Sequence, residues 1–178
     1  WIVFGSISFF KYSEFLKCVI SFVIGNSLLN SFEGWIIMIR YGYHFLSALL
    51  ISILLLLIMF TMDVVTHTTH LTLLLINIDF IADPNQTPLI LELLIHIVIG
   101  FLIYITFLII YKFFKPFYKI SYLLLIIIFL ILYPLLILLA QRSFFQFSWT
   151  EYGLWMIAHL IFTVCMAWSI PYFSKKKW

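Results

Sequence analysis

The sequence predicts an all-α protein, a bundle of helices that crosses a membrane several times. Of its 178 residues, 65% are hydrophobic and only 10% are charged, whereas soluble domains carry about 25% charged residues. The mean hydropathy of +1.19 is far too apolar for a surface that faces water. Much of the apolar area must therefore face lipid.

The region before Tyr43 is apolar but is interrupted at helical spacing. The interrupting residues are Glu14, Lys17, Ser21 and Gly25. Such a narrow polar stripe favours an amphipathic helix that lies at the membrane interface. We assign residues 1–42 to this interfacial helix and its connector, and residues 43–178 to a transmembrane domain. A fifth span within the first 42 residues is the alternative.

Four apolar runs are long enough to cross about 30 Å of hydrocarbon at about 1.5 Å per residue. They cover about residues 43–62, 88–111, 120–140 and 152–173. Pro134 should kink the third span, because proline lacks the N–H of the helix ladder. Residues 71–81 are too short to span and predict an extramembrane or re-entrant segment. Since Gly100 stands alone in its span, we expect Leu, Ile and Phe packing rather than close backbone approach between helices.

The basic residues predict the orientation of the four spans. Of the 10 Lys and Arg residues, all but Arg142 fall on one side of the membrane. The positive-inside rule makes this the cytoplasmic or matrix side, and both termini lie on it. The heavy use of Ile, Leu and Phe is typical of an AT-rich genome. We therefore expect either the bacterial cytoplasmic (inner) membrane or the mitochondrial inner membrane.

Ionisable side chains inside a span indicate where function is to be sought, because each costs at least about 2.5 kcal/mol at the helix centre. The candidates are Glu92, His96, Arg142, Glu151 and His159. Glu92 and His96 share one helix face at i, i+4, and so do Glu151 and His159 at i, i+8. If the bundle closes, the four could meet in a cavity near the outer leaflet, with Arg142 as counter-ion.

Three interpretations of these residues remain open. They can be structural, satisfying one another between helices. They can form a site for protons or a small ligand, because buried His and Glu are suited to both. Alternatively, His96 and His159 lie at equal predicted depth, which bis-histidine haem ligation would need. Asp63, His67 and His70 separately share a predicted helix face that could bind zinc or simply be a hydrated helix end.

Several function classes lack support in the sequence. The net charge of +3 is small, and there is no basic stripe with stacking aromatics for nucleic acid. The two cysteines have neither CxxC nor zinc-type spacing. No catalytic triad, nucleotide-binding glycine loop or pair of catalytic carboxylates occurs. The sequence therefore leaves open whether the protein is an enzyme and favours a non-enzymatic role. We predict no resident cofactor, and as partners the lipid bilayer and other membrane subunits.

Part of the chain resembles a known family. The segment WTEYGLWMIAHLIF, Trp149–Phe162, is similar to the W-x-E-x7-H-L segment that opens the last span of YagU-type bacterial inner-membrane proteins. YPLLILL around Pro134 resembles that family's proline-bearing third span, and DPN at residues 83–85, followed by His96, is a weaker similarity. The Pro134 to Glu151 spacing and the region before Tyr43 depart from the family pattern.

This resemblance covers about half the chain. It implies a four-helix inner-membrane protein of unassigned molecular activity, and it marks Glu151 and His159 as family-like positions. Taken together, the sequence predicts a small polytopic membrane protein, a structural or accessory component with an outer-leaflet polar cavity for a small ligand or protons. The alternatives are a haem-carrying anchor subunit of a respiratory complex and a small transporter.

Overall fold

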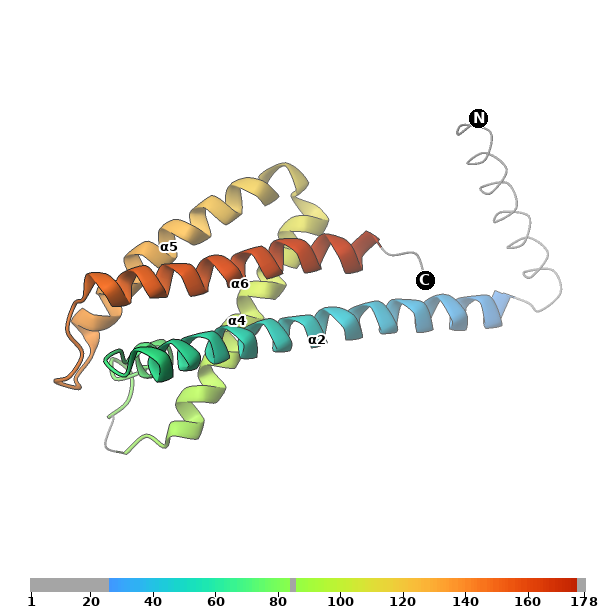
Figure 1. Cartoon of the computed structure of the whole chain (residues 1–178). Coiled ribbons are helices and arrows are strands. Elements are labelled where there is room, and N and C mark those ends of the chain that lie inside the picture. The colour runs from blue at the N-terminus through green and yellow to red at the C-terminus, as the bar shows by residue number, and fades with distance from the viewer. Residues whose placement is uncertain (1–25, 84–85, 176–178) are drawn as a thin grey trace. The chain divides into compact units, whose positions relative to one another are not determined.

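The computed structural model describes residues 26–83 and 86–175, with side chains from Met38 onwards. Within these ranges the chain is helical and contains no strand (Figure 1). The elements are α2 (Asn26–Thr66), α3 (Leu71–Leu75), α4 (Leu89–Phe113), the 3₁₀ turn η1 (Lys115–Phe117), α5 (Tyr118–Leu139) and α6 (Trp149–Lys175).

Four helical segments are long and apolar enough to cross a membrane. They are Met38–Thr66, Leu89–Phe113, Lys115–Leu139 and Trp149–Lys175. The predicted all-α fold with four spans is therefore confirmed, and each span is longer than the apolar run that predicted it. Many large apolar side chains on these helices are exposed, among them Leu138 and Ile161. A water-soluble surface would not tolerate so much apolar area, whereas lipid covers it at no cost.

Residues Tyr43–Lys177 form one compact unit, and the residues before Tyr43 fall outside it. Helix α2 nevertheless continues through the boundary at Gly42 without a break. The predicted amphipathic stripe over residues 14–25 lies outside the described residues. The interfacial helix, and the alternative of a fifth span, therefore stay predictions.

Helix α6 packs against both α4 and α5 in the core of the unit, and Figure 1 shows α5 running beside α6. The core is rich in aromatic side chains, and Tyr104, Tyr133 and Trp155 are fully buried. Each has a polar atom that needs a partner inside the bundle. For Trp155 this partner is the backbone carbonyl of Phe129 on α5, which accepts a 3.2 Å hydrogen bond from Nε1.

Gly100 marks a close approach between α2 and α4. A Cβ added to Gly100 would lie 2.2 Å from Oγ and 2.9 Å from Cβ of Ser52. The expectation that the helices avoid close approach is therefore wrong. It relied on finding two small residues in one helix, whereas here one glycine faces one serine on the neighbouring helix.

The segment between α2 and α4 folds against the bundle. Leu71 and Leu74 of α3 are buried, as are residues 76–79 of the loop that follows. This is the segment predicted to be extramembrane or re-entrant because it is too short to span. Its burial places an asparagine and an aspartate among the helix ends, where they become part of the sites described next.

Candidate functional site

An ion cluster joins three separate segments of the bundle. Arg142, just after α5, pairs with Glu92 of α4 and lies 3.4 Å from Asp79 of the α2–α4 loop. The side chain of Arg142 is 17% exposed and that of Asp79 is 0% exposed. Gln141 adds two bonds to Asp79, donating from its backbone N–H to Oδ2 and from Nε2 to the backbone carbonyl. One guanidinium thus serves two buried carboxylates.

The structure brings together Arg142 and Glu92 from the predicted site, but it does so with Asp79, which the sequence analysis did not single out. Asp79 lies in an apolar segment that is too short to span, and no helical periodicity there predicted that its side chain would be buried. The one sign of a special role was the presence of an acidic residue in such an apolar segment.

Glu151 does not join this cluster. It lies in the first turn of α6, where a carboxylate is favoured by the helix dipole. Its Oε2 accepts a 3.2 Å hydrogen bond from the hydroxyl of Tyr133 on α5. Within the described chain no ion pair links Glu151 to Arg142, and no hydrogen bond links it to His159. Its observed contacts are those of a residue that fastens the start of α6 to α5.

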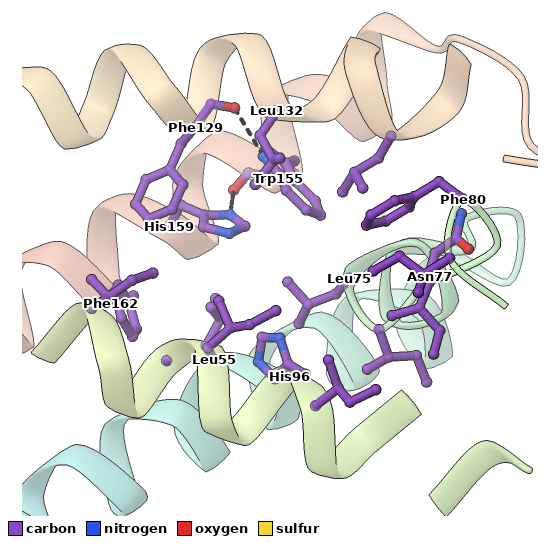
Figure 2. Close-up of a pocket in the computed structure, with 18 residues that line it drawn as sticks. Leu55, Leu75, Asn77, Phe80, His96, Phe129, Leu132, Trp155, His159 and Phe162 are labelled. Atoms are coloured by element: carbon purple, nitrogen blue, oxygen red, sulfur yellow. Dashed lines mark hydrogen bonds between the residues drawn. The ribbon is translucent and has the colours of Figure 1, made fainter. Parts of the chain in front are cut away.

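A cavity of about 210 Å³ lies within the bundle. All four long helices and the α2–α4 loop contribute to its wall, and Figure 2 shows His96 and His159 entering it from α4 and α6. The wall is apolar apart from His96, His159 and Asn77, because the indole N–H of Trp155 is already used by the carbonyl of Phe129. The two predicted histidines therefore do share one cavity, but its character is mainly apolar.

The hydrogen bonding of His159 leaves one ring nitrogen for the cavity. Its Nδ1 lies 2.9 Å from the carbonyl oxygen of Trp155, one turn earlier in α6. A carbonyl only accepts, so Nδ1 carries the hydrogen, and Nε2 of the neutral ring keeps a lone pair. The rings of Phe129 and Trp155 each lie 4.2 Å from the imidazole, centroid to centroid. These contacts hold the ring in one orientation.

His96 lines the same cavity from α4. Its Nε2 is buried and has no partner among the described residues. Which of its two nitrogens carries the hydrogen depends on the partner that each nitrogen meets.

Asn77 adds an amide group on the loop side of the cavity. Its Oδ1 accepts a 2.8 Å hydrogen bond from the backbone N–H of Asp79, which sets the orientation of the amide. Its Nδ2 is buried without a partner in the described part of the chain. Buried polar atoms are nearly always paired with protein, water or a ligand. Among these groups, the Nε2 lone pair of His159 is the acceptor that the cavity wall offers to an occupant.

A further group of polar side chains, missed by the sequence analysis, links α2, α4 and α6. Nδ1 of His44 is 3.0 Å from the hydroxyl of Tyr104, and Nε2 is 3.4 Å from Oγ of Ser174. Ser169 lies 3.5 Å from the same tyrosine hydroxyl. His44 stands at the predicted edge of its span, where a histidine is ordinary. The signal that could have found this group is the position of Tyr104, on the same face of α4 as His96.

Asp63, His67 and His70 do not share a helix face, because α2 ends at Thr66 and His67 has a φ of 56°. Asp63 instead caps α3, accepting hydrogen bonds from the backbone N–H groups of Leu71 and Thr72. The ring of His70 lies 5.1 Å from that of Phe144. Over residues 38–83 and 86–175, whose side chains the structure describes, no three His, Cys, Asp or Glu side chains are grouped so that they could hold a metal.

No protein-family model, curated protein or solved structure matches this chain. The resemblance of Trp149–Phe162 to YagU-type proteins therefore stays a prediction.

Proposed function

We propose that this chain, with four helices long and apolar enough to cross a membrane, is a small integral membrane protein. We further propose that it is a non-catalytic accessory component that binds a small, mainly apolar ligand in the cavity lined by His96 and His159. The observation that carries this proposal is the combination of an apolar cavity with buried polar atoms that the protein itself leaves unpaired.

The size of the cavity supports a binding role over a purely structural one. A cavity of about 210 Å³ leaves the apolar side chains of its wall without the close contacts that a packed core would give them. A bundle selected only for stability would fill such a space with larger side chains, since interiors are normally close-packed. The retained space indicates a use for it.

The same volume limits the ligand. A cavity of about 150 Å³ accommodates benzene or xenon, whereas drug-sized molecules occupy about 300–1,000 Å³. The cavity of about 210 Å³ therefore suits one ring with a few substituents, or a short branched chain. Toluene is a suitable first probe.

The test compares toluene binding by the wild-type protein and by Leu132→Trp, which places a large ring in the cavity wall. Both proteins are purified in the same detergent, and the methyl NMR signals of Leu and Ile are followed during titration. We expect saturable shifts in the wild type and none in the filled variant. Equal, non-saturating shifts in both proteins would show that toluene only enters the micelle, and would refute the proposal.

Haem ligation by His96 and His159 is the second candidate, favoured by the position of both histidines in the wall of one cavity. A porphyrin is larger than the cavity, so α4 and α6 would have to separate to admit it. An absorption spectrum of protein purified from haem-replete cells decides the matter. A Soret band that disappears in His159→Ala supports haem, and its absence removes this candidate.

We also propose that both termini lie on the cytoplasmic or matrix side. The lysines of the α4–α5 turn, Lys112, Lys115 and Lys119, are exposed at one end of the spans. Arg142 at the other end pairs with Glu92 and is largely buried, so it presents little free positive charge there. This distribution supports the positive-inside orientation. Other membrane subunits remain proposed partners.

A further inference from the structure

We propose that the ligand of the cavity is a small hydroxyl compound, a phenol or a compact alcohol, which donates a hydrogen bond to His159. This inference rests on the proposed function and names the chemical class of its ligand. It follows from which ring nitrogen of His159 carries the hydrogen, and so from the partner of this histidine inside the bundle.

The imidazole of His159 presents an acceptor to the cavity. The ring uses its Nδ1–H on the backbone carbonyl of Trp155. A neutral imidazole has one N–H, so Nε2 offers only a lone pair. A ketone, quinone, ether or carboxylate would also offer only lone pairs there, and would leave this nitrogen unpaired. A ligand with an O–H satisfies it.

The surroundings favour the neutral form of His159. The residue is 2% exposed and is enclosed by the aromatic rings of Phe129 and Trp155. A charged imidazolium would be buried among these rings, which is strongly unfavourable. The acceptor character of His159 therefore follows from its own packing.

The apolar wall favours a hydroxyl over an aliphatic amine. A hydroxyl donates a hydrogen bond without carrying a charge. An aliphatic amine would be protonated at neutral pH and would carry a charge into an apolar space. The apolar wall, with Leu55, Ile103 and Phe162 among its residues, suits the hydrocarbon part of the ligand.

Three probes of similar size test the inference: 4-fluorophenol, 4-fluoroanisole and 4-fluorotoluene. The first donates and accepts, the second only accepts, and the third does neither. Binding to the purified protein in detergent is measured by ¹⁹F NMR, and Leu132→Trp supplies the correction for micelle partitioning. Because each buried lone pair that gains a hydrogen bond favours the complex, we expect 4-fluorophenol to bind about tenfold more tightly than the other two.

The histidine variants locate the effect. His96→Phe and His159→Phe keep a ring of similar size but remove the lone pair. The phenol preference should fall more in His159→Phe than in His96→Phe, while fluorotoluene binding persists. If all three probes bind the wild type equally, the hydroxyl inference is wrong and the cavity proposal stands. If none binds more than it does to Leu132→Trp, both are wrong.

The ring nitrogens can also be observed without any substitution. With ¹⁵N-histidine in the wild-type protein, the shifts of the His96 and His159 signals report which nitrogens are protonated. We expect Nε2 of His159 to be unprotonated and to shift on addition of 4-fluorophenol but not of 4-fluorotoluene. A protonated Nε2 in His159 would overturn the inference even if the Phe variants fail to fold.

Discussion

At the scale of single residues, the buried polar side chains differ in how completely the protein satisfies them. Asp63 uses both oxygens to hold α3, and the indole N–H of Trp155 is bonded to α5. His96 and Asn77, by contrast, each keep one buried polar atom without a partner in the described chain. The satisfied groups are explained by folding, whereas the unsatisfied ones at the cavity wall call for an occupant.

Removal of Arg142 should be the most damaging change in the ion cluster. Arg142→Ala leaves Glu92 and Asp79 buried without their counter-ion, which costs about 3–5 kcal/mol when a buried pair loses one partner. Asp79→Asn is the matched control, because Arg142 then keeps Glu92. We expect the melting temperature in detergent to fall much further for Arg142→Ala. Equal losses for the two variants would show that the ion pairing is not what stabilises this end of the bundle.

Asp63 should act as a helix cap rather than as a metal ligand. Asp63→Ala removes acceptors for the first N–H groups of α3 and should lower the free energy of unfolding by about 0.5–2 kcal/mol. His67→Asn serves as the control and should have little effect, because His67 is exposed and asparagine tolerates its φ of 56°. A stabilisation of the wild type by added zinc that both variants abolish would contradict this assignment.

At the scale of the helices, the contact of α2 with α4 depends on two small residues. Gly100 and Ser52 allow the backbones to approach. Helix packing in a membrane relies on such close contacts, because lipid supplies no hydrophobic drive between helices. A larger side chain at either position would therefore force the two helices apart.

A double-mutant cycle should reveal this contact. Gly100→Ala forces a Cβ to within 2.9 Å of Ser52 Cβ and should cost about 1–3 kcal/mol through overpacking. Ser52→Gly removes both clashing atoms and leaves Cα at 3.7 Å as the nearest. The second change should therefore be less harmful, or even beneficial, when Gly100→Ala is already present.

Gly153 offers the control for this cycle. It also lies inside a helix, α6, but an added Cβ there would meet nothing within 4 Å. Gly153→Ala should be neutral or slightly stabilising, because alanine is favoured over glycine in helices by about 1 kcal/mol. If Gly100→Ala and Gly153→Ala have the same effect on thermal unfolding, the α2–α4 approach is looser than described.

At the scale of the whole molecule, the orientation of the four spans can be tested directly. In a background with Cys18→Ser and Cys165→Ala, single cysteines replace Ser143 in the α5–α6 loop and Phe114 in the α4–α5 turn, both exposed. A membrane-impermeant maleimide applied to intact bacterial cells should label Ser143→Cys at once and Phe114→Cys only after permeabilisation. The reverse pattern would refute the proposed orientation.

The membrane-spanning architecture was predictable because it depends on a local property of each segment. About 20 consecutive apolar residues suffice to identify a span, whatever its neighbours are. Reasoning from single segments gave a wrong prediction at Gly100, because the close approach there is a contact between two helices. It also gave no indication that the segment 76–79 would be buried, since that burial depends on the helices around it.

The candidate site was predictable only in part. Equal depth in two spans indicated that His96 and His159 could share a cavity, and the structure places both in its wall. The predicted depth of Glu151 did not show that its side chain would contact Tyr133 and stay outside the cavity. Depth also could not predict that Asn77 lines the cavity or that Asp79 joins the ion cluster, because both lie in a loop whose path no helical periodicity describes.

The sequence by itself determined that the chain is helical and carries four segments long and apolar enough to cross a membrane, because backbone polar groups in lipid must be satisfied within each apolar helix. The tertiary structure alone decided which polar side chains meet. That choice depends on the rotation and spacing of neighbouring helices, which small residues such as Gly100 and Ser52 set, and on the folding of the α2–α4 loop. The lone pair of His159 in a mainly apolar cavity is a product of this second level.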